Sequence, residues 1–357
     1  MSDPELSFTR SVAESEDDII LAGVYDHWDV YEPATRTYGY RRKREGGDPW
    51  GGDDHYFHTA SLCKYVDPAG NGQPYFVALS SEGDVYHHGL TDGFTERIKW
   101  AGIHHDEAVG YGRMTSIRQI GNKLYACGSG GQIYVRHGRD DWRFLTKDLL
   151  WNPDAAYYDA DEMPDEEKEP EAYEAWEKAY DESQKDNVSV SIFDINGPAE
   201  DEIYICGSNG LLYLWDGESL EDMESDVPNA LMTIHVADDG IVWICGSEGQ
   251  ILSIDQENGL EHHTDDENEH LFISITTYQG RVLLASNASP WGVFEFNPDS
   301  EELTEIVIDK DYPPKWLHTV DAVGDVLWVV GTRDIFRLKD DIWERIEHPD
   351  IPHPSKR

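Results

Sequence analysis

The sequence has few basic residues and no long apolar run. Of 357 residues, 28 are Lys or Arg and 72 are Asp or Glu, giving a formal net charge of −44 at pH 7. Nucleic acid is therefore an unfavourable ligand, because phosphate binding needs a basic surface. No stretch approaches the ~20 apolar residues of a membrane span. The first residues, Met1–Ser7, have neither the basic start nor the apolar run of a signal peptide, so we expect a cytoplasmic protein without a membrane partner.

Cysteine is also scarce, with four residues: Cys63, Cys127, Cys206 and Cys245. The last three stand in the same short phrase, Cys-Gly-Ser, which recurs along the chain. Equivalent positions in repeated units are separated by the distance between units, which is too long for a disulfide. We therefore expect buried free thiols that pack as small apolar side chains, in agreement with a reducing compartment.

The Cys-Gly-Ser motif belongs to a longer repeat in residues 124–134, 203–213 and 242–252, where a turn separates two β-rich runs. Four weaker copies complete the series, and its anchor positions are Gly23, Ser80, Gly128, Gly207, Gly246, Ser286 and Gly331. The last three spacings are 39, 40 and 45 residues, close to the ~40–50 residues of a four-stranded propeller blade. Such units cannot bury their own apolar faces and must stack on one another.

The last copy shows four short apolar runs, at residues 317–322, 326–331, 335–338 and 342–346, separated by Gly-Asp and Asp-Asp turns. Short alternating runs with tight turns are typical of antiparallel strands. The same count fits residues 188–224 and 229–264. We therefore predict an all-β, seven-bladed β-propeller of four-stranded antiparallel blades. It forms one domain over residues 1–347 with a tail at 348–357, and six or eight blades also fit the irregular first units.

One segment interrupts the repeat. Residues 148–187 hold 15 Asp or Glu against three Lys and no strand pattern. Pro170 and the Ala, Glu and Lys after it predict a helix near residues 170–183. Three aromatic residues fall on one face of this helix, where binding of a partner and packing on the domain itself are equally open. The candidate partner-binding residues are Glu166, Glu167, Glu169, Tyr173, Trp176 and Tyr180.

No motif with catalytic spacing is present. Histidines pair as His87-His88, His104-His105, His262-His263 and His55 with His58. Neighbours on a strand face opposite ways, so surface positions are favoured over metal ligands. The Ser-x-Gly turns lack the following helix of a nucleophile elbow. We therefore predict no catalytic, cofactor or metal site.

Two segments near the N-terminus are favoured as surface elements. The basic cluster Arg41–Arg44 is the only one in the chain, and we expect it to pair with local carboxylates. Residues 46–54 are rich in Gly and Asp. They lack the Gly-Lys-Ser/Thr of a phosphate loop and are expected to form a flexible loop, with Trp50 as its anchor.

The repeat resembles two groups of propellers. The segment 127–134 followed by Asp140–Phe144 is similar to sialidase-like and photosystem-assembly-like propellers. The segment Arg139–Trp142 lacks the Ser and Gly of their Asp box, so sialidase activity is not implied. Residues 203–217 resemble the repeat motif of bacterial WD-repeat-like propellers, which are often encoded beside Rhs-type or type VI secreted toxins. That resemblance implies a cytoplasmic immunity protein that binds and blocks a cognate toxin domain. The negative charge of the chain favours a basic partner, because complementary fields speed encounter.

Two other functions stay open, because one fold serves many roles. The chain could be a scaffold with several partners and no toxin. It could also be a carbohydrate-active or other hydrolase with its site in the central channel, which predicts several carboxylates of perturbed pKa there.

Overall fold

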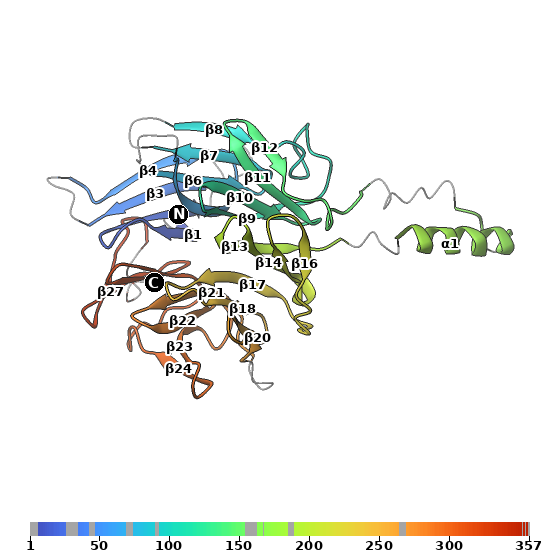
Figure 1. The fold of residues 1–357 in the computed structure, drawn as a ribbon. Coiled ribbons are helices and arrows are strands. Elements are labelled where there is room, and N and C mark those ends of the chain that lie inside the picture. The colour runs from blue at the N-terminus through green and yellow to red at the C-terminus, as the bar shows by residue number, and fades with distance from the viewer. Residues whose placement is uncertain are drawn as a thin grey trace.

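The computed structural model describes residues 6–25, 35–42, 47–68, 74–89, 93–153, 163–166, 168–184, 189–263, 269–351, 353 and 355. Their strands form seven four-stranded antiparallel sheets, each built from four strands that are consecutive in the chain (Figure 1). The prediction of a seven-bladed propeller is therefore confirmed, and the alternatives of six or eight blades are excluded.

The blades follow chain order. Blades 1 to 3 contain β1 (Leu6–Ala13), β2 (Asp18–Tyr25), β3 (Thr35–Arg41), β4 (Trp50–His55); β5 (Thr59–Val66), β6 (Pro74–Ser80), β7 (Asp84–His88), β8 (Gly93–Arg97); and β9 (Met114–Ile120), β10 (Lys123–Gly128), β11 (Gln132–Gly138), β12 (Asp141–Phe144). Blades 4 and 5 contain β13 (Ile192–Ala199), β14 (Glu202–Gly207), β15 (Leu212–Trp215), β16 (Leu220–Asp222); and β17 (Leu231–Val236), β18 (Val242–Gly246), β19 (Ile251–Asp255), β20 (Gly259–His262). Blades 6 and 7 contain β21 (Phe272–Tyr278), β22 (Arg281–Ser286), β23 (Gly292–Asn297), β24 (Glu302–Ile306); and β25 (Leu317–Val323), β26 (Val326–Gly331), β27 (Ile335–Lys339), β28 (Ile342–Arg345). A short 3-10 turn, η1 (Ser208–Gly210), follows β14.

The core lies between neighbouring blades, as stacked repeats require. One apolar cluster joins Tyr204 and Cys206 of blade 4 to Ile234 and Ile244 of blade 5. All four cysteines are buried and free, as predicted. Burial raises the pKa of the Cys63 thiol to about 12, and it likewise raises the pKa of Cys206. The thiols therefore stay protonated and pack as apolar groups.

The anchor glycines of the repeat are needed for close backbone approach. Gly207 ends β14 with an extended φ of −171°, which any residue adopts. A Cβ at Gly207 would lie 2.2 Å from the carbonyl oxygen of Ser191, and one at Gly246 would lie 2.0 Å from that of Ala230. These oxygens precede the first strand of the same blade. Glycine is therefore required because a side chain would separate the two innermost strands.

Contacts between the first and last blades close the ring. The backbone N–H of Ala13 donates to Asp321 Oδ2 at 2.8 Å, and Trp328 Nε1 donates to the carbonyl of Ser15 at 3.1 Å. The fully buried Trp328 shares one apolar cluster with Leu6 and Phe8. Each sheet keeps its own four strands, so side-chain packing and these bonds hold the seam.

One expected loop is a strand. Residues 50–55 form β4, which pairs with β3 from Tyr40↔Trp50 to Thr35↔His55, so the prediction of a flexible loop over 46–54 is wrong for this part. Trp50 is the anchor, because its ring lies 4.9 Å from that of Tyr40 and 4.5 Å from that of His348. Packing of one aromatic residue outweighs the low strand propensity of Gly and Asp.

The topology gives the ring two distinct ends. Because strands in a blade alternate in direction, the connection from each fourth strand to the next blade leaves at the same end as the turn between strands two and three. We call this end the interblade face. It carries the connections 56–58, 98–113, 145–191, 223–230, 263–271 and 307–316. The opposite face carries the turns between strands one and two and between strands three and four.

Candidate partner-binding face and channel

The acidic insertion leaves and rejoins the ring at one turn. Residues 148–187 belong to the connection between β12 and β13, on the interblade face. Gly130 N donates to the carbonyl of Val190 at 2.7 Å, and Trp151 N donates to the carbonyl of Gly130 at 2.9 Å. Both ends of the insertion are therefore fixed to the turn that follows β10.

The predicted helix is present as α1 (Pro170–Gln184), which stands out to one side of the blades (Figure 1). It is the one α-helix in the described part of the chain. The described helices include none long and apolar enough to cross a membrane.

The aromatic residues of α1 form a stack along the helix. The ring centroids of Tyr173 and Trp176 are 6.2 Å apart, and those of Trp176 and Tyr180 are 5.5 Å apart with nearly parallel planes. All three side chains are half-buried. The three aromatics therefore share one helix face, as the sequence predicts, but their role toward a partner stays a prediction.

The candidate carboxylates lie just before this helix. Glu166 and Glu169 are exposed, and Glu167 lies outside the described residues. Glu169 accepts a backbone hydrogen bond from Tyr173 through its carbonyl at 2.9 Å, which begins the first turn of α1. The carboxylates of Glu166 and Glu169 are therefore accessible to a cationic group.

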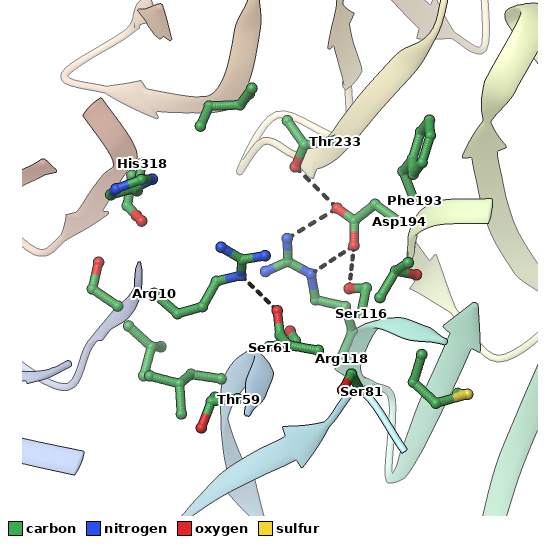
Figure 2. A pocket seen from close by; sticks show the side chains of 18 of the residues that line it. Arg10, Thr59, Ser61, Ser81, Ser116, Arg118, Phe193, Asp194, Thr233 and His318 are labelled. Carbon is green, nitrogen blue, oxygen red and sulfur yellow. Dashed lines mark hydrogen bonds and ion pairs between the residues drawn. The ribbon is translucent and has the colours of Figure 1, made fainter. Parts of the chain in front are cut away.

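A channel of about 1540 Å³ runs along the first strands of the blades. In its wall, Arg118 of β9 donates two hydrogen bonds to Asp194 of β13, at 2.9 and 3.2 Å (Figure 2). Asp194 also accepts from Ser116 at 2.6 Å and from Thr233 at 3.0 Å. Burial raises the pKa of Asp194, but Arg118 and these bonds bring it below its ordinary value. Asp194 is thus a structural carboxylate joining blades 3, 4 and 5.

A second carboxylate lies at the seam of the ring. Burial raises the pKa of Asp321 to about 6, although the N–H of Ala13 partly offsets it. Burial and, after it, the nearby Arg118 and Arg10 lower the pKa values of His235 and His318 to about 4.

The channel wall also includes Glu82 and Asp84. Glu82 accepts from the backbone N–H groups of Ile103 and His104, and Asp84 accepts from Ser80. The carboxylates that line the channel are thus engaged in hydrogen bonds, whereas the hydrolase hypothesis requires several available ones.

The histidine pairs form no cluster of metal ligands in the described part of the chain, although His55 and His88 both contact the ring of Tyr86, at 4.6 and 6.0 Å. His87 is buried, stacks on Phe94 at 4.4 Å and lies 3.6 Å from Glu96, whereas its neighbour His88 faces outward. His263 follows β20 of blade 5 and contacts Ser253 of the same blade at 2.8 Å. Among the described residues, no group of three or more His, Cys, Asp or Glu could hold a metal ion.

The basic cluster is paired locally where the structure describes it. Arg41 contacts Asp18 at 3.2 Å, and Arg42 contacts Glu344 at 3.0 Å and Asp17 at 3.8 Å. The prediction of local ion pairs is confirmed for these two residues, while Lys43 and Arg44 lie outside the described residues. Exposed pairs of this kind contribute little free energy.

Comparison with known proteins agrees with the fold. No protein-family model matches the chain. Among solved structures, the WD40 β-propeller domain of Doa1 is 12% identical with a TM-score of 0.56, covering 94% of this chain and 93% of that one. YCF48 bound to D1 peptide is 13% identical with a TM-score of 0.56, covering 97% of this chain and 94% of that one. At these identities the likeness concerns the fold alone.

A curated relative adds a second kind of evidence. "Immune protein Tsi7" of Pseudomonas aeruginosa is 26% identical over 272 residues, which cover 76% of this chain and 72% of that protein. The resemblance to immunity-type β-propellers, predicted from the repeated phrase, is confirmed by this relative together with the seven-bladed fold.

Proposed function

We propose that this protein is a cytoplasmic immunity protein that binds a cognate secreted toxin domain, of the Rhs or type VI kind, and blocks its active site. The observation that carries the proposal is the similarity to an immune protein over most of both chains. The protein is a rigid, non-enzymatic binder in this role, because rigid scaffolds commonly present binding segments on their connecting loops.

Charge supports a basic partner. The chain carries a formal net charge of −44, and complementary fields accelerate encounter between proteins. In this proposal the carboxylates of Glu166, Glu167 and Glu169 take the place of the anionic substrate in the toxin's active site, which the exposure of Glu166 and Glu169 supports. Tyr173, Trp176 and Tyr180 add aromatic area, which often dominates the energy of an interface.

The test uses the toxin domain encoded beside this gene, purified as a catalytically inactive variant. We expect tight 1:1 binding by calorimetry. Deleting residues 154–186 should weaken the affinity far more than about tenfold, because it removes both the carboxylates and the aromatic stack. The matched control replaces the exposed Glu218 and Glu221 of blade 4 with Gln, which should leave affinity unchanged.

Three results would contradict parts of this proposal. Absence of binding by the intact chain would reject the immunity role. Unchanged affinity after the deletion would reject only the role of the insertion. Recovery of a multi-subunit host complex without any toxin would favour the scaffold hypothesis.

A further inference from the structure

Two exposed tryptophans have a backbone conformation that is unfavourable for a bulky residue. Eleven described non-glycine residues have positive φ, and nine of them are Asp, Asn, Glu or Gln, whereas the others are Trp100 at 71° and Trp316 at 48°. Such a conformation costs free energy in a residue that carries a Cβ. Strained residues of this kind gather at functional sites, where the surrounding structure holds them.

Neither indole recovers this cost through full burial. The exposed fraction is 38% for Trp100 and 55% for Trp316. Both are nevertheless held in place. The ring of Trp100 stacks on Phe144 with centroids 5.8 Å apart, and the backbone carbonyl of Trp316 accepts from Thr332 N at 3.1 Å. The two indoles are therefore presented to the outside on a fixed backbone.

Both tryptophans lie on the interblade face. Trp100 stands in the connection from blade 2 to blade 3, and Trp316 in the connection from blade 6 to blade 7. In a ring of seven blades, these two seams lie on opposite sides of the channel. The indoles therefore lie on opposite sides of the interblade face, an arrangement that suits a protein surface better than a small molecule.

Other exposed apolar residues are concentrated on the same face. Tyr56 at the channel mouth is 81% exposed, and Ile103, Val109 and Val307 also belong to interblade connections. On the opposite face, the large exposed apolar residues among those described are Val66 and Ile342. An exposed apolar surface of this kind marks an interaction site.

The charge of the interblade face as a whole favours a basic occupant. Its exposed acidic residues include Asp106, Glu107, Glu224, Asp226 and Glu248. Lysines lie next to the aromatic rings: Lys99 over Trp100 at 5.2 Å, Lys147 over Phe144 at 4.9 Å and Lys315 over Trp291 at 5.1 Å. The acidic insertion leaves from this face as well, so negative charge predominates over the face although cations neighbour the rings.

We propose that the interblade face is the docking face for the toxin domain, with Trp100 and Trp316 as its two aromatic anchors. This inference rests on the proposed function and adds the face and the residues to it. The partner is a basic protein domain whose apolar patches receive the two indoles on opposite sides of this face. Aromatic side chains that become buried at an interface supply much of its affinity. The negative charge of the face speeds encounter with a basic domain.

The test separates an anchoring role from a structural one. Trp316→Gly and Trp100→Gly remove the indole and also relieve the left-handed backbone, which glycine adopts readily. We expect each variant to keep or raise the Tm of the free protein, while its Kd for the inactive toxin domain rises by about tenfold or more. Trp316→Phe, which keeps an aromatic ring, should lose less affinity. Ile342→Ala, 70% exposed on the opposite face, is the control and should bind like the native chain.

The outcomes are distinguishable. If the native chain binds the toxin domain and both glycine variants bind equally well, the docking face is wrong while the proposed function stands. A marked fall in the Tm of the glycine variants, with the affinity of Trp316→Phe unchanged, would assign the tryptophans a structural role and overturn the inference. Weakened binding by Ile342→Ala would place docking on the other end of the ring. No binding by the native chain would overturn the proposed function itself.

Discussion

Arg118 and Asp194 form an ion pair with two hydrogen bonds, 2.9 and 3.2 Å long, that joins blade 3 to blade 4 in the wall of the channel. The carboxylate is almost fully buried, whereas the guanidinium keeps contact with the channel. Removing the cation therefore leaves a buried negative charge that only hydroxyl and amide donors offset.

We expect Arg118→Met to lower the free energy of unfolding by about 2–4 kcal/mol, measured by urea denaturation. The matched control is Arg143→Met, whose exposed pair with Asp141 at 2.7 Å should contribute nothing measurable. Equal effects of the two substitutions would contradict the role of the buried pair.

The charge of Asp321 should make stability depend on pH. Its folded pKa is about 6, above the ~3.9 of an unfolded Asp, so the folded state binds the proton more tightly. Stability from this group is therefore present below pH ~4 and lost as pH rises through 6. We expect Asp321→Asn to be about 1–2 kcal/mol more stable than the native chain at pH 7.5, and equal to it at pH 4. Asp299→Asn, on the exposed edge of blade 6, controls for the loss of one negative charge.

The anchor glycines should not tolerate a methyl group. Gly246→Ala brings a Cβ within 2.0 Å of a backbone oxygen, so the two inner strands of blade 5 must separate. We expect a loss of about 2–3 kcal/mol in unfolding free energy, measured by thermal and urea denaturation. Gly138→Ala is the control, because nothing lies within 4 Å of its added Cβ. A similar loss in both variants would show that flexibility, and not close approach, explains the repeat.

The residues after β28 should be needed for stability. Ile351 and His348 are buried in the core shared by blades 1 and 7, and the His348 ring lies 4.6 Å from that of Tyr38. Removing residues 346–357 should therefore cost about 3–5 kcal/mol, read as a fall in Tm. Removing residues 353–357 alone should change Tm little, and an equal fall would contradict this role.

Salt should slow association with the toxin. Exposed charges farther apart than ~10 Å are screened at ~0.1 M salt, so a partner attracted by net charge should bind fastest at low ionic strength. We expect the association rate constant to fall by at least about tenfold between ~20 mM and ~500 mM NaCl in stopped-flow measurements, with a smaller change in the dissociation rate. A rate independent of salt would contradict a basic partner.

The blades were predictable because their signals are local. The turn phrase around Gly207 and the alternating apolar residues after it identify a blade without any long-range information. Strand β4 was missed for the opposite reason. Its Gly and Asp residues have low strand propensity, and Trp50 holds them through contacts with Tyr40 and His348, which are distant in sequence.

The channel could not be read from the sequence for a related reason. Arg118, Asp194 and Asp321 come from three different blades, and only ring closure brings their strands to one wall. The left-handed conformation of Trp100 and Trp316 has no sequence signal either, because turn residues with positive φ are normally recognised as Gly, Asn or Asp.

The attachment of the acidic insertion has an evolutionary consequence. Trp151 and Val190 are both tied to the turn at Gly130, so the intervening stretch is grafted at a single point on an otherwise complete ring. Replacing that stretch with another sequence need not disturb any blade. If the proposed function holds, specificity for a different toxin can therefore evolve by exchange of the insertion alone, while the seven blades are inherited unchanged.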